Sequence, residues 1–170
     1  MIRSITIFPC LLMMLVTATA FAQRVRVDDY LSPNQTYALD LQWNASEIKR
    51  ALNAMIAGEA SAMPPLVGRV DGVEVRLDTR AYLGKRARIF LALPILISGL
   101  DSPSDLELRW DASGEFLPGA VRPGQSTLIF EGVVDEPVTG FVMDFVLALE
   151  NGGAADGFSL EPVYEIELLP

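Results

Sequence analysis

Apolar and polar residues alternate with a period of two along much of the chain, and this pattern predicts β-strands with one buried face. Residues 37–43 and 106–110 both follow it, which places the two tryptophans, Trp43 and Trp110, on inward rows. Residues 141–149 are apolar on both faces except at Asp144, so we expect a central strand covered on both sides. Further strands are expected at residues 25–27, 70–79, 86–93, 127–134 and 164–168.

Residues 44–58 have a helical period instead. Asn44 is suited to cap the helix and Gly58 to end it, and the apolar residues between them fall on one stripe: Ile48, Ala51, Leu52, Met55 and Ile56. We expect this short amphipathic helix to pack on the core. A helix that binds membranes would carry more lysine and arginine on its polar face.

Clusters of Gly, Pro, Asn and Asp separate the eight or so short strands. This organisation predicts an all-β protein, a two-layer β-sandwich of immunoglobulin-like or Greek-key topology with one short amphipathic helix. A β-barrel is the alternative, because regular alternation does not distinguish sheets that close from sheets that stack.

Residues 1–22 have the features of a cleavable secretory signal peptide. A basic Arg3 precedes a mostly apolar run at residues 5–16, and small residues end the segment as Ala20-Phe21-Ala22. The mature chain would begin at Gln23, and residues 23–170 have the usual length of a single domain. We therefore expect a bacterial protein of the periplasm or one that is secreted, with no stable membrane insertion after the signal is removed.

Acidic residues dominate the composition. The mature chain would carry 12 basic and 22 acidic residues, a net charge of −10, because removal of the signal takes away Arg3 and no carboxylate. Nucleic-acid binding is not expected, since it requires a dominant positive surface.

The side chains that most often carry catalysis are missing. The chain has no histidine, and Cys10 lies in the signal, so we expect no enzyme, no cofactor and no metal. Carboxylates remain: Asp111 and Glu115 could form a catalytic pair, and Asp144 could act alone or accept a hydrogen bond from a loop. Three acidic loops, at residues 101–105, 111–115 and 150–156, could bind calcium, but none has the EF-hand spacing and each is typical of a turn.

Residues 73–94 concentrate basic side chains in this acidic chain. We take six residues as a candidate binding site: Arg76, Arg80, Tyr82, Lys85, Arg86 and Arg88. A tight hairpin centred on Gly84 would place Arg80 opposite Arg88, which is unfavourable, so we expect the chain to pass here from one sheet to the other. The cations either pair with the protein's own carboxylates or receive an acidic protein or an anionic glycan.

These features predict an exported, non-enzymatic binding or structural module of the cell envelope. A protein partner at a sheet edge or at the basic strand is the expected mode of interaction, because sandwiches have edges with unpaired main-chain groups. A carbohydrate-binding module that stacks sugars on Trp43, Trp110 or Tyr82, or a carboxylate-dependent glycan-acting protein, is one alternative. A pilus or fimbrial subunit is another, although residues 24–27 make a short donor arm.

Overall fold

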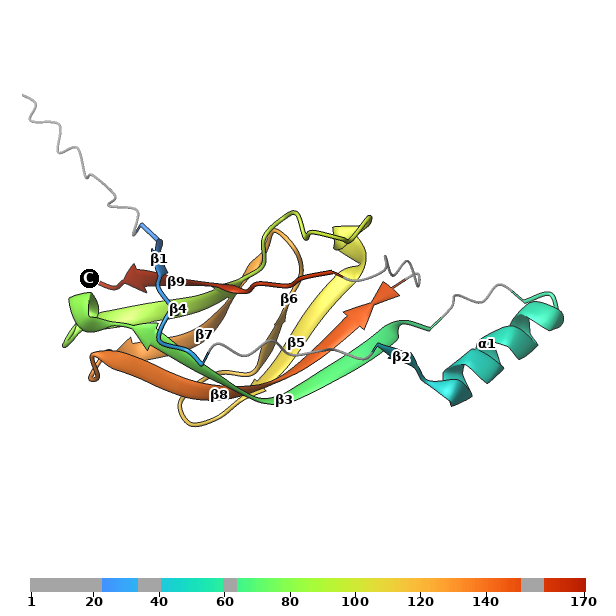
Figure 1. Cartoon of the computed structure of the whole chain (residues 1–170), viewed down its shortest axis with the longest axis horizontal. Coiled ribbons are helices and arrows are strands. Elements are labelled where there is room, and N and C mark those ends of the chain that lie inside the picture. The colour runs from blue at the N-terminus through green and yellow to red at the C-terminus, as the bar shows by residue number, and fades with distance from the viewer. Residues whose placement is uncertain (1–22, 34–40, 60–63, 151–157) are drawn as a thin grey trace, which may run out of the picture.

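The computed structural model describes residues 23–33, 41–59, 64–150 and 158–170, which form two stacked antiparallel sheets and one helix (Figure 1). One sheet has the order β1 (Val25–Val27), β9 (Val163–Leu168), β4 (Arg86–Ala92) and β7 (Ser126–Val133). The other has the order β2 (Gln42–Trp43), β3 (Leu66–Asp78), β8 (Val138–Leu149), β5 (Leu106–Ala112) and β6 (Gly119–Val121). The predicted two-layer sandwich is confirmed, since the strands form two open sheets and not one closed sheet. The predicted signal peptide lies outside the described residues.

The inward rows of the two sheets form the core. Ile89 and Leu91 of β4, Leu77 of β3 and Leu147 of β8 are almost completely buried, as the alternation predicts. Strand β8 is central, between β3 and β5. Its outer face is not covered as expected, because Val142 is 41% exposed and the described residues include no third layer over this sheet.

The two tryptophans have different environments, so the prediction that both are inward is wrong for Trp43. Trp110 is 3% exposed, and its indole N–H donates to the carbonyl of Leu117 at 3.0 Å. Trp43 is 45% exposed. It belongs to the two-residue strand β2 at the margin of the five-stranded sheet, where a strand has a neighbour on one side only. The first part of the predicted strand, residues 37–40, lies outside the described residues.

The predicted helix is confirmed as α1 (Ala45–Ile56), but its packing is not. The Asn44 side chain caps the helix by accepting from the Ser46 N–H at 3.0 Å, and Gly58 follows with a positive φ of 80°. The helix extends away from the two sheets (Figure 1). Ala51 is its buried residue, whereas Leu52, Met55 and Ile56 are exposed. Helical periodicity identifies an apolar face but not the surface that covers it.

Candidate functional site

The chain passes from one sheet to the other within the predicted basic site. Strand β3 ends at Asp78 in the five-stranded sheet, a 3-10 helix spans Arg80–Tyr82, and β4 begins at Arg86 in the four-stranded sheet. Gly84 has a φ of 74°, in the left-handed region that favours glycine. The expected crossing between sheets is therefore confirmed, and Arg80 and Arg88 do not face each other across a hairpin.

Hydrogen bonds hold this corner against the loop between β7 and β8. The buried Thr79 hydroxyl lies 2.8 Å from the carbonyl of Glu136, to which it donates, and 2.9 Å from the hydroxyl of Thr139. The backbone N–H of Gly84 donates to the Val134 carbonyl at 2.7 Å. The Val134 N–H donates in turn to the Lys85 carbonyl at 2.9 Å. The corner thus fixes the end of β7 as well as the start of β4.

The six predicted site residues are distributed over three surfaces. Arg76 lies on the outer face of the five-stranded sheet, between the buried residues Val75 and Leu77. Arg86 and Arg88 lie on the outer face of the four-stranded sheet. The remaining three, Arg80, Tyr82 and Lys85, lie at the corner. Residues 76–88 therefore do not form one continuous basic stripe.

Most of these side chains already have partners in the chain. Arg76 pairs with Glu74 at 2.5 Å, and Arg80 pairs with Asp78 at 3.0 Å. Lys85 Nζ donates to the carbonyl of Ala81 at 3.1 Å. Tyr82 is half-buried against the core, which limits its use as a stacking surface.

Arg88 belongs to a row of alternating charges that crosses β7, β4 and β9 and ends at Arg24, directly before β1. It stands opposite Glu131 of β7 and Glu167 of β9 in the strand register, and its Nε lies 2.7 Å from the Glu131 carboxylate. The hydrogen bond from Arg88 holds the pKa of Glu131 below its usual range. Arg24 completes the row at 3.2 Å from Glu167, and its guanidinium covers the Phe90 ring at 3.6 Å from the centroid. Pairing with internal carboxylates thus accounts for Arg88, whereas Arg86 makes no ion pair with any described residue.

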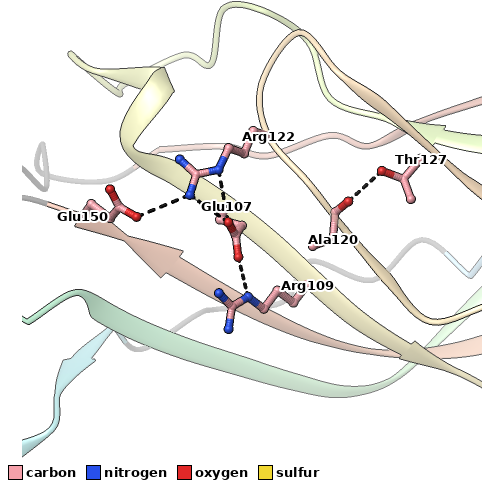
Figure 2. Close-up of polar contacts among 6 residues, drawn as sticks. All are labelled: Glu107, Arg109, Ala120, Arg122, Thr127 and Glu150. Carbon is pink, nitrogen blue, oxygen red and sulfur yellow. Dashed lines mark hydrogen bonds and ion pairs between the residues drawn. The ribbon is translucent and has the colours of Figure 1, made fainter.

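A second charge network lies on the outer face of the five-stranded sheet (Figure 2). Glu107 is central: Arg122 donates to one of its carboxylate oxygens at 2.8 and 3.1 Å, and Arg109 donates to the other. The hydrogen bond from Arg109 is the main reason that the pKa of Glu107 is lowered. Arg122 also contacts Glu150 at 3.4 Å, which ties the end of β8 to β5. These contacts have a structural role.

Among the carboxylates considered for catalysis or metal binding, Asp144 has a structural role. Asp144 accepts the backbone N–H of Gly72 at 2.7 Å and so holds the bulge between Val70 and Val73 of β3. This is the loop-supporting role weighed for it above. Within residues 23–33, 41–59, 64–150 and 158–170, no three acidic side chains are grouped so that they could hold a metal ion.

An acidic cavity of about 220 Å³, which the sequence analysis did not predict, lies beside the end of β7. It is lined by residues 113–116, Phe130, residues 134–136 and residues 139–140. Glu115, Asp135 and Glu136 are exposed at this cavity, and their carboxylates make no ion pair with any described residue. Both acidic turns are visible in the sequence, but only the fold brings them together.

Comparison of the chain with protein-family models, with curated proteins and with solved structures finds no match. Among the described residues, no helix has both the length and the apolar character needed to cross a membrane. The argument for function therefore depends on the surfaces described above.

Proposed function

We propose that the protein is an exported, non-enzymatic binding module of the bacterial cell envelope that engages a protein partner through a sheet edge. The observation that carries this proposal is the edge of β7. This strand has eight residues, and in its sheet it pairs with β4 alone. The second half of this strand, Glu131–Val133, has no strand on its other side and can offer main-chain N–H and C=O groups to an added strand.

The other sheet edges are less suited to strand addition. Strands β1, β2 and β6 are only three, two and three residues long in all, whereas the open residues of β7 belong to a strand of eight that is paired with β4 from Ser126 to Val133. Strand β3 extends beyond its short neighbour β2, but it is interrupted by the bulge between Val70 and Val73 and carries charged residues there, Arg69 and Asp71. Bulges and charges are the usual features that protect an edge against pairing. Strand β7 also has an irregularity, but it lies at Ile129, before the open residues Glu131–Val133.

Export and the absence of catalysis are supported by the sequence. The features of residues 1–22 are those of a secretory signal, and the mature chain would have neither histidine nor cysteine. Such a chain lacks the usual general base near neutral pH and the usual thiol nucleophile. A binding role is compatible with both properties.

Site-specific photo-crosslinking in intact cells tests the proposal. The chain has only two lysines, Lys49 and Lys85, so amine-reactive reagents would sample little of its surface. We would place benzoylphenylalanine at Val133 on the β7 edge, with Leu96 as the control, since it is also exposed and follows the opposite end of β4. A defined protein adduct at Val133 but not at Leu96 is expected. If the protein is exported but forms no adduct at any position along β7, the proposal is refuted.

The basic residues allow a separate test for a charged partner. Arg86 and Arg88 lie on the same face of β4, but of the two only Arg88 has an ion pair with a described residue. If this face binds an acidic protein or an anionic glycan, R86E should weaken capture of the partner and leave the melting temperature unchanged. If the cations serve stability alone, R88E should lower the melting temperature and R86E should have no effect on capture.

The exposure of Trp43 favours a second candidate function, glycan binding. An exposed indole beside α1 provides a flat surface on which a sugar ring can stack. Titration with soluble peptidoglycan fragments should then change the fluorescence of the wild-type protein and of W110F, but not that of W43F. Unchanged emission in all three proteins would exclude stacking of these fragments on Trp43.

A further inference from the structure

We propose that Glu131–Val133 of β7 forms the binding edge itself, and that it receives an extended segment of the partner whose lysine or arginine side chain enters the acidic cavity. This inference depends on the proposed function and specifies the chemistry of the partner. It commits to one occupant, a β-strand with a basic residue.

The direction of the main chain in β7 follows from its hydrogen bonds. The carbonyl of Arg86 in β4 points toward β9, where it accepts a hydrogen bond from the Leu169 N–H at 2.9 Å. Main-chain groups of successive residues in a strand point to opposite sides, so Ala87 faces β7, where it is paired with Gly132. Glu131 and Val133 must then direct their N–H and C=O groups away from β4. No described residue bonds to these main-chain groups.

The open part of the edge is short and well defined. Farther back along β7, the Ile129 carbonyl accepts from the Leu117 N–H at 2.8 Å on this same outer side. The Thr127 hydroxyl donates to the Ala120 carbonyl at 2.6 Å, as Figure 2 shows. The chain around β6 therefore occupies the first half of the edge. The second half offers the main-chain groups of Glu131 and Val133, enough for a short extended segment.

The position of the cavity fits a strand placed on this edge. Glu131 pairs with Arg88 on the outer face of the sheet, and Val133 shares that face, whereas Gly132 is on the inner side opposite the buried Ala87. A partner residue placed beside Gly132 would likewise point inward. Phe130 and Val134, two residues before and after Gly132, both line the acidic cavity. That partner side chain would therefore enter the cavity.

The chemistry of the cavity selects a cation. Glu115, Asp135 and Glu136 are among its lining residues and have no ion pair with any described residue, and Phe116 and Phe130 also line it. A lysine or arginine side chain can place its alkyl part against the rings and its charge among the carboxylates. A glutamate at the same position would be repelled.

Two capped peptides test this inference on the full mature chain, residues 23–170. The probe is acetyl-Thr-Val-Lys-Val-Thr-amide, and the control has glutamate in place of lysine. We expect the lysine peptide to shift the NMR amide signals of Glu131 and Val133 and to slow hydrogen exchange at both. We expect the glutamate peptide to bind at least about tenfold more weakly. Equal affinities, or shifts confined to other strands, would overturn the proposal.

Variants separate the contribution of the edge from that of the cavity. V133P removes an N–H that the fold does not use, and proline is tolerated at strand edges, whereas V133T keeps the N–H. V133P should reduce peptide affinity about tenfold or more, and V133T should stay within about twofold of the wild type. If V133P fails to fold, the exchange rates of Glu131 and Val133 in the wild-type protein decide the matter.

The triple variant E115Q/D135N/E136Q should bind both peptides with similar affinity, because the carboxylates that distinguish them are gone. A retained preference for lysine would overturn the assignment of the cavity. Failure of the peptide experiments together with a protein adduct at Val133 in cells would reject this inference and leave the proposed function standing. If the peptides do not bind and no adduct forms at Val133 in cells, this inference and the proposed function are both rejected.

Discussion

Replacement of Thr79 by valine tests how the corner between the sheets is held. Thr79 is the buried polar side chain of the core among the described residues, with 0% exposure. Its hydroxyl donates to the Glu136 carbonyl at 2.8 Å and lies 2.9 Å from the Thr139 hydroxyl. Valine has nearly the same shape, so T79V removes these interactions without creating a cavity.

The expected loss follows from the two hydrogen bonds. A net contribution of about 0.5–1.5 kcal/mol is typical of each, and a buried group left unpaired costs about 1–3 kcal/mol. Glu136 is an exposed residue, so we expect water to offset part of the loss at its carbonyl. We therefore expect T79V to lower the free energy of unfolding by about 1–2 kcal/mol. With an m-value of about 2 kcal/mol/M, the urea midpoint should fall by roughly 0.5–1 M.

Urea unfolding followed by tryptophan fluorescence measures this effect. T79S keeps the hydroxyl and should retain more stability than T79V, and a T79V/T139V double-mutant cycle isolates the interaction between the two hydroxyls. A T79V protein within about 0.3 kcal/mol of the wild type would show that the hydroxyl does not stabilise the corner.

Three further predictions concern packing, pH and exposure. A Cβ on Gly119 would lie 2.8 Å from the Trp110 ring, so G119A should lower the free energy of unfolding by about 1–3 kcal/mol in urea. G140A, whose Cβ would approach nothing closer than 3.9 Å, should have little effect, and equal losses in both variants would contradict this packing. The lowered pKa of Glu107 stabilises the fold above the usual glutamate pKa, and this stability is lost as the pH falls through the lowered value. E107Q should therefore be less stable than the wild type at pH 7 and should lose less stability on acidification; parallel pH profiles would contradict this. Acrylamide should quench W110F strongly, through Trp43, and W43F weakly, and equal quenching would refute the difference in exposure.

Most strands could be predicted because the alternation of apolar and polar side chains involves only residues close together in the sequence. The expected ranges of residues 86–93, 127–134 and 164–168 agree closely with β4, β7 and β9. Strand β6 and the 3-10 helices could not be found this way, since each has only three residues and shows no periodicity. The crossing at Gly84 was predictable because it depended on the repulsion of two nearby arginines.

The candidate site was less predictable than the fold. The sequence showed a cluster of cations at residues 76–88, but it did not show which carboxylates would lie opposite them. Arg88 meets Glu131 and Glu167 only because β4 is placed between β7 and β9. The acidic cavity combines turns at residues 113–116 and 134–136 for the same reason.

By itself, the sequence determined the extended backbone, the capped helix and the identity of most core residues. Period and capping depend on residues a few positions apart, so they act before any long-range contact forms. The tertiary structure decided what covers each face: it left Trp43 and much of α1 exposed, paired most of the basic residues, and left one side of Glu131–Val133 without a neighbouring strand. These outcomes depend on which strands become neighbours, and strand order joins residues that are far apart in the chain.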